Sequence, residues 1–142
     1  MRNKHRQHTP DLNRRLLLGG AAATLLLGVN PVALAAIASV VAVRVWPAQA
    51  YTRITIESTV PLTFSQFTLK NPERLVVDMQ GIDLNNELQA LSTKVGNGDP
   101  FIQQLRAARN KPGVVRLVVD LKAPVAPQIF TLDPIEGYKH RL

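Results

Sequence analysis

One strand-like motif occurs twice in this chain, and the second copy begins 63 residues after the first. A duplicated unit indicates that one structural motif is used twice around a common core. This limits the possible folds more than any other feature of the sequence. The matching segments are Arg53–Glu57, Pro61 and Phe67–Leu69 in the first copy, and Arg116–Asp120, Pro124 and Phe130–Leu132 in the second.

The second copy ends early in its last strand. In the first copy, Arg74-Leu75 opens the strand-like run Val76–Met79. In the second copy, Arg141-Leu142 takes that place four residues late, and the sequence stops there. We therefore expect a fragment of a longer protein, in which about four more strand residues follow Leu142. We also expect its truncated sheet to have a short, exposed edge.

Alternation of apolar and polar residues predicts two units of short strands, and the short turns within each unit favour antiparallel pairing. Each unit has one apolar face, so the sequence predicts an all-β fold. We expect a β-sandwich of two symmetric four-stranded sheets, with the last strand truncated. A barrel of the same strands is the alternative. The predicted strands are Val40–Val45, Tyr51–Ser58, Thr63–Leu69, Arg74–Met79, Phe101–Arg109, Val114–Leu121, Gln128–Leu132 and the incomplete Tyr138–Leu142.

One short helix is predicted between the two copies. Leu84, Leu88 and Leu91 recur at helical spacing, and Asn85 precedes the helix as a candidate N-cap. After a loop at 96–100, the second copy turns at Lys111–Val114, where Pro followed by Gly favours a type II turn.

The first 35 residues have the three zones of an export signal. Polar residues lead to Arg14-Arg15, which resembles a twin-arginine signal, and the apolar run Leu16–Val29 follows. Its 14 residues fall short of the roughly 20 that span a bilayer. We expect export by the twin-arginine translocation machinery, cleavage after Ala35 and no stable membrane span afterwards. An ordinary secretory leader, a signal anchor and cleavage after Ala38 are the alternatives.

Most of the positive charge belongs to this leader. Residues 1–35 hold five basic residues and one acidic residue, a net charge of +4, whereas residues 36–142 carry only +3. No basic stripe remains for a phosphate backbone, so we expect no nucleic-acid partner. The chain has no cysteine, which excludes disulfides, thiolate catalysis and Cys-based metal sites.

Residues 36–142 offer little for catalysis. His140 is their only histidine, too few for a catalytic zinc site, and no nucleophile elbow or phosphate loop is present. We therefore predict no catalytic residue, metal ligand or cofactor in this chain. Glu57 and Asp120 occupy matching positions in the two copies, and cross-strand pairing with arginines explains them better than acid–base chemistry.

The arginines and one tryptophan are the candidate binding residues. They occur in or beside strands whose alternate positions are apolar. A guanidinium group can donate two hydrogen bonds to one carboxylate. Peptide-linked cell-wall glycan is rich in carboxylates, although surface ion pairs are an alternative role for each arginine. The tryptophan precedes Pro47, where it can stack on a sugar or cover the edge of the core. The candidates are Arg44, Arg53, Arg74, Arg106, Arg109, Arg116 and Trp46.

Three segments resemble the AMIN domain of periplasmic N-acetylmuramoyl-L-alanine amidases of the AmiC type. These segments are Val43–Pro47, Tyr51–Glu57 and Asn71–Asp78, and the resemblance extends over residues 39–142. It implies a β-sandwich of two symmetric sheets that binds peptidoglycan and brings an amidase to the division septum. In such amidases a separate zinc-dependent domain, absent here, cleaves the bond between N-acetylmuramic acid and L-alanine.

The resemblance favours a peptidoglycan-binding and septal-targeting module of an amidase that separates daughter cells. Two alternatives remain open. The sequence can be the part of a complete zinc amidase that precedes its catalytic domain, or an AMIN domain of an envelope secretion or pilus protein. Whether the protein is an enzyme stays undecided, and the expected location is the periplasm.

Overall fold

The computed structural model describes residues 37–142, which form one compact unit. The predicted signal peptide, with Arg14, Arg15 and cleavage after Ala35, lies outside the described residues.

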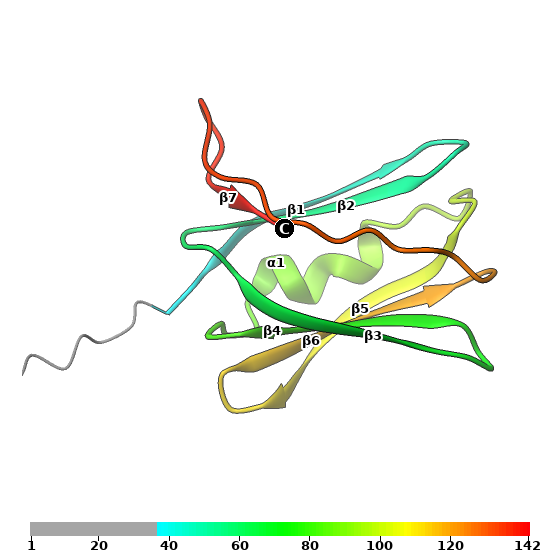
Figure 1. Ribbon diagram of the computed structural model, residues 1–142, viewed down its shortest axis with the longest axis horizontal. Coiled ribbons are helices and arrows are strands. Elements are labelled where there is room, and N and C mark those ends of the chain that lie inside the picture. The colour runs from blue at the N-terminus through cyan, green and yellow to red at the C-terminus, as the bar shows by residue number, and fades with distance from the viewer. Residues whose placement is uncertain (1–36) are drawn as a thin grey trace, which may run out of the picture. The chain divides into compact units, whose positions relative to one another are not determined.

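The strands form two antiparallel sheets, drawn as an upper and a lower layer in Figure 1. This arrangement confirms the predicted all-β fold of two sheets and distinguishes a sandwich from a barrel. The three-stranded sheet has the order β1-β2-β7, with β1 at Val40–Pro47, β2 at Thr52–Ser58 and β7 at His140–Arg141. The four-stranded sheet has the order β3-β4-β6-β5, with β3 at Thr63–Leu69, β4 at Arg74–Gln80, β5 at Ile102–Lys111 and β6 at Val114–Leu121.

The prediction of four strands in each sheet is wrong for the sheet β1-β2-β7, which has three strands. The run Gln128–Leu132 makes only an isolated bridge, between Leu132 and Arg141. Its neighbour β7 is only two residues long, so most of the run Gln128–Leu132 has no strand beside it with which to form a ladder of hydrogen bonds. A regular strand needs a continuous partner to satisfy its backbone groups.

The two copies also do not form one sheet each. The first copy supplies β1 and β2 to one sheet and β3 and β4 to the other, because the chain crosses between layers after Ser58. The second copy supplies β5 and β6 to the four-stranded sheet and β7 to the three-stranded sheet. Each sheet is therefore a mixture of both copies.

The strand register shows that the two sheets are nevertheless built alike. Asp120 on β6 lies opposite Arg74 on β4, and Glu57 on β2 lies opposite Arg141 on β7. These are matching positions of the repeat. The internal symmetry predicted from the sequence is therefore present, with exchanged strands.

The core lies between the sheets and takes its side chains from alternate strand positions, as the period of two requires. Val43 and Ile56 face it from one sheet, and Val77, Leu105 and Leu117 face it from the other. The largest fully buried side chains are Met79, Ile82, Leu88, Leu91, Leu105 and Val115.

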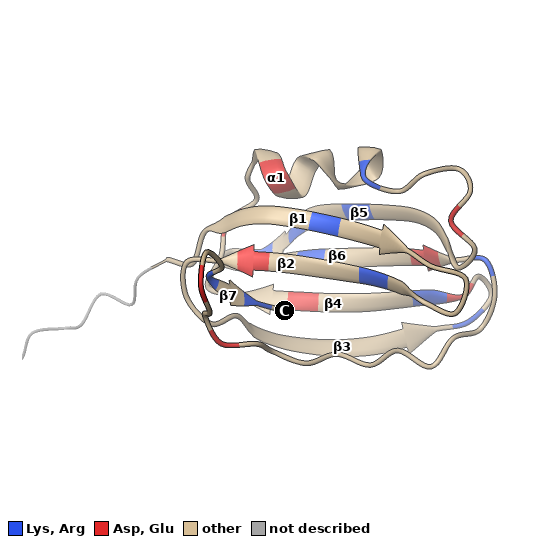
Figure 2. Cartoon of the chain, turned by 90° about the horizontal axis from the view of Figure 1, so that it is seen from above, with Lys and Arg blue, Asp and Glu red and all other residues tan. Residues whose placement is uncertain are grey.

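A short helix covers one side of the sandwich. Helix α1 spans Asn86–Gln89, continues as a 3-10 turn over Ala90–Thr93, and contacts β1 and β5. As predicted, Asn85 caps α1: its side chain accepts from the Leu88 N–H, and it also donates to the Val40 carbonyl. The segment after β6 crosses the opposite side of the sandwich (Figures 1 and 2).

Two loops have identifiable anchors. Gly113 adopts φ 72°, as the predicted type II turn requires at that position. The buried Asp99 carboxylate accepts from the Phe101 and Ile102 N–H groups and from the Thr52 hydroxyl. Asp99 therefore ties the connection between the copies to the beginnings of β2 and β5.

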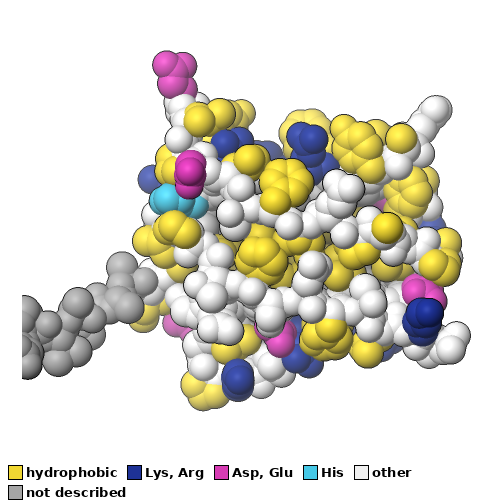
Figure 3. Space-filling model, viewed as in Figure 1, with side chains coloured by type: hydrophobic (Ala, Val, Ile, Leu, Met, Phe, Trp, Pro, Cys, Tyr) yellow, Lys and Arg dark blue, Asp and Glu magenta, His cyan; other side chains and the backbone are white. Residues whose placement is uncertain are grey.

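Figure 3 shows the side crossed by the segment after β6, where hydrophobic side chains lie exposed between the two layers. Among the described residues, no helix is long and apolar enough to cross a membrane.

Candidate functional site

Each sheet turns one face to the core and the other to solvent. Because residues alternate along a strand, those between the core positions point outward. On both sheets these outward positions hold arginines and carboxylates. The two outer faces are therefore the candidate functional surfaces.

Asp120 is the centre of a charge cluster on the four-stranded face. Its carboxylate accepts from Arg74 Nε at 2.7 Å and from Arg106 Nε and Nη2 at 3.0 and 3.3 Å. Burial alone raises the pKa of Asp120, but the hydrogen bonds from Arg106 and Arg74 outweigh it and lower the pKa below its usual value. Asp120 therefore stays ionised and holds both guanidinium groups in place.

A second ion pair lies beside this cluster. Arg116 donates through Nε and Nη2 to the two oxygens of Asp78, both at 2.8 Å, which is a bidentate geometry. The hydrogen bonds from Arg116 lower the pKa of Asp78. The Phe67 ring covers the Arg116 guanidinium, with its centroid 5.4 Å from the central carbon.

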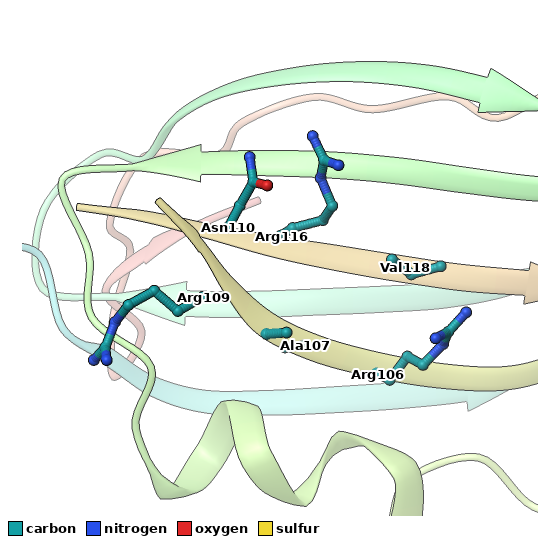
Figure 4. A pocket seen from close by; sticks show the side chains of 7 residues that line it. Arg106, Ala107, Arg109, Asn110, Arg116 and Val118 are labelled. Atoms are coloured by element: carbon teal, nitrogen blue, oxygen red, sulfur yellow. The ribbon is translucent and has the colours of Figure 1, made fainter. Parts of the chain in front are cut away.

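A depression of about 200 Å³ opens on this face between Arg106 and Arg116. Small side chains, Ala108 and Val118, line it between the two arginines. Figure 4 shows that Arg109 also borders the depression but points away from Arg106 and Arg116. The depression therefore offers two fixed guanidinium groups around a small apolar surface.

The three-stranded face, toward the viewer in Figure 2, repeats the cluster around Glu57. Arg44 Nη1 donates to Glu57 Oε2 at 2.9 Å, and the Lys139 N–H donates to Glu57 Oε1 at 2.9 Å. The Lys139 backbone bond, followed by the Arg44 bond, lowers the pKa of Glu57. Arg44 and Glu57 thus match Arg106 and Asp120, which supports the cross-strand pairing predicted for both carboxylates.

Aromatic side chains accompany the arginines on this face. The Tyr138 ring lies 5.5 Å from the Arg44 guanidinium and 5.1 Å from that of Arg141, and the Tyr51 ring lies 5.8 Å from that of Arg53. Trp46 is 62% exposed, so it does not cover the core edge. Covering the core edge is therefore the wrong one of the two roles considered for Trp46, and contact with a ligand stays a prediction.

Comparison with known proteins assigns the fold to a family. Residues 42–142 match the AMIN domain family model. The chain belongs to the AMIN domain family. It is 49% identical over 131 residues to the N-acetylmuramoyl-L-alanine amidase AmiC of Escherichia coli O6:H1, and 46% identical over 136 residues to the AmiC of Neisseria meningitidis serogroup B. Each alignment covers 92% of this chain but only 31% and 32% of those proteins.

The AMIN fold divides the seven residues predicted from the sequence into three groups. Arg44, Trp46 and Arg53 lie on the three-stranded face, and Arg74, Arg106 and Arg116 lie on the four-stranded face. Arg109 belongs to neither face: it alternates with Leu105 and Ala107 on the core-facing side of β5 and pairs with Asp83 at 3.6 Å.

Sequence reasoning missed Asp78 and Arg141 on the faces of this AMIN domain. Both occupy outward positions, Asp78 opposite Arg116 and Arg141 opposite Glu57. The sequence does show Arg116 and Glu57 as charged residues of the repeat. It does not show that Asp78 and Arg141 lie opposite them, because that depends on which strands pair.

The described part of the AMIN domain does not fit a zinc site. No group of three His, Cys, Asp or Glu side chains in residues 37–142 is placed to hold a metal ion. The carboxylates of the two faces are instead occupied by arginines. What these faces can do chemically is bind, through guanidinium donors and aromatic rings.

Proposed function

We propose that residues 39–142 bind peptidoglycan and target a cell-wall amidase to it, in the periplasm at the division septum. The observation that carries this proposal is the AMIN match over residues 42–142, which includes both outer faces. The two relatives named as amidases favour this reading over a secretion or pilus protein.

The geometry supports binding of a carboxylate-rich polymer. Asp78 and Asp120 hold their arginines in fixed rotamers, so less side-chain entropy is lost when a ligand binds. An arginine has five donors, and Arg44 uses one of them on Glu57. The remaining donors can reach carboxylates of the stem peptides. Two faces on one domain allow weak contacts to add up along a polymer.

The hydrolase activity belongs, in this proposal, to a part of the protein beyond these residues. The chain spans about a third of the length of the amidases it matches. A separate domain would hold the zinc ion and cleave the bond between N-acetylmuramic acid and L-alanine, which contributes to daughter-cell separation. The role of residues 39–142 is to concentrate that activity at its substrate.

Export precedes binding in this proposal. Replacing Arg14-Arg15 by Lys-Lys should stop export by the twin-arginine machinery, so that the protein accumulates uncleaved in the cytoplasm. Cell fractionation and mass measurement of the mature protein check this result. Unchanged export of the Lys-Lys variant would assign the leader to the ordinary secretory route.

Binding can be tested by sedimenting residues 36–142, which contain the whole described core, with purified sacculi. We expect the protein to appear in the pellet at low salt and to be released as salt rises, because guanidinium–carboxylate contacts are screened. Protein that remains in the supernatant at low salt would overturn the proposed function.

A paired variant tests the arginines. Arg44→Ala with Arg106→Ala removes one matching arginine from each face, and we expect less protein in the pellet. The control is Lys70→Ala with Lys94→Ala, which removes the same charge from the turn after β3 and from the end of the 3-10 helix. Equal sedimentation of the two double variants would reject the arginine assignment and leave the binding proposal standing.

A further inference from the structure

The two outer faces differ in their aromatic side chains. The chain has one tryptophan and two tyrosines, and all three lie on the three-stranded face. Trp46 is 62% exposed, Tyr51 is 54% exposed and Tyr138 is 47% exposed. Side chains of this size usually bury most of their surface, so three half-exposed rings on one face are unusual.

The fold does not require these rings. Trp46 lies opposite Arg53 just as Ala108 lies opposite Arg116 in the matching place of the other sheet. By the same repeat, Tyr51 corresponds to Val114. The sandwich is therefore built equally well with small residues at these positions, and the aromatic rings serve another purpose.

The rings are arranged along the face. Trp46 and Arg44 are successive outward residues of β1, about 6.8 Å apart along the strand. Arg44 in turn lies against the Tyr138 ring, and Arg53 lies between Trp46 and Tyr51. Aromatic rings thus alternate with guanidinium groups from one end of the face to the other.

A longer turn brings Tyr138 into this row. The turn between β3 and β4 occupies residues 70–73, whereas the matching connection from Leu132 to β7 occupies residues 133–139. Gly137, at φ 74°, and the bridge between Ile135 and Tyr138 fold these extra residues into a small hairpin, which extends from the upper layer in Figure 1. The first copy has no equivalent of this hairpin.

We propose that the three-stranded face binds the glycan strand of peptidoglycan, with Trp46 and Tyr138 stacking on its sugar rings. This inference rests on the proposed function and assigns the polysaccharide to one face of the domain. Pyranose rings present flat C–H surfaces that suit exposed aromatic rings, and the intervening arginines suit hydroxyl and N-acetyl oxygens. Trp, Tyr and Arg are also enriched at protein–protein hot spots, so a protein partner is the competing occupant that the experiment below must exclude.

The chain has a single tryptophan, so tryptophan fluorescence reports on Trp46 alone and tests the proposal directly. Residues 36–142 are titrated with the β-1,4-linked hexamer of N-acetylglucosamine, a glycan without stem peptide. We expect a saturable shift of the emission to shorter wavelength and protection from acrylamide quenching. An unchanged spectrum up to millimolar hexamer, with sedimentation on sacculi intact, would overturn this inference and not the proposed function.

Matched variants locate the site. Tyr138→Ala should weaken hexamer binding about fivefold, and Tyr138→Phe, which keeps the ring, should restore it. Phe67→Ala removes an aromatic ring that covers an arginine on the other face, and we expect it to leave hexamer binding unchanged. Equal effects of Tyr138→Ala and Phe67→Ala would reject the assignment to one face. Loss of sacculus binding by Trp46→Ala, together with an emission spectrum of the unsubstituted protein that hexamer leaves unchanged, would instead indicate a peptide or protein ligand, which also overturns it.

Discussion

Asp120→Asn should lower the free energy of unfolding by about 2 kcal/mol. The substitution keeps the shape of the side chain but removes the charge that accepts three N–H···O contacts from Arg74 and Arg106. Hydrogen bonds to charged groups contribute about 1.5–3 kcal/mol each, whereas exposed ion pairs contribute about 0–1 kcal/mol. The Asp120 side chain is 15% exposed, but the arginines are 36% and 48% exposed, so the value for the whole cluster lies between these limits.

The assay is thermal unfolding followed by circular dichroism. For a domain of this size, about 1 kcal/mol corresponds to about 4 °C, so we expect the melting temperature to fall by about 8 °C. Asp133→Asn is the control, because it makes the same charge change at an exposed position whose side chain has no ion pair among the described residues. Equal melting temperatures for the two variants would refute the reasoning that the Asp120 cluster stabilises the sheet.

Leu105→Ala removes a fully buried side chain and should cost about 2–5 kcal/mol in urea denaturation; a loss below about 1 kcal/mol would contradict its place in the core. Burial raises the pKa of Asp120, but its two arginine partners lower it overall, so its contribution is complete above about pH 4 and is lost as the pH falls through the lowered pKa. Denaturation between about pH 6 and pH 2 checks this, since stability independent of pH would contradict it. Appending Val-Val-Asp-Met after Leu142, in imitation of Val76–Met79, should place the new aspartate opposite Arg53 and raise the melting temperature, and an unchanged value would argue against it.

Local structure could be predicted from the sequence because local signals were strong. Thr63–Leu69 has the same bounds in the prediction and in the structure, since Pro61 and Asn71-Pro72 delimit it. Asn85 was identified as a helix cap because its side chain type and the leucine spacing both indicated one. Signals of this kind lie within a few residues of the element that they specify.

Strand pairing could not be predicted in the same way. Alternation shows which face of β2 is buried, but not whether β2 lies beside β3 or β7. The chain places β2 beside β7, more than 80 residues away, and the partners of the arginines depend on that choice. Asp78 was missed as the partner of Arg116 for this reason, and Arg109 was grouped with residues whose face it does not share.

The exchange of strands between the sheets has a consequence for how the protein folds. A nascent chain that has completed only the first copy possesses two hairpins but no finished layer, because each hairpin awaits strands from the second copy. Neither copy is therefore an autonomous folding unit, although the sequence reads as a tandem duplication. Separately produced halves, divided in the loop at 96–100, should be unfolded alone and should assemble on mixing, in the manner of a heterodimer.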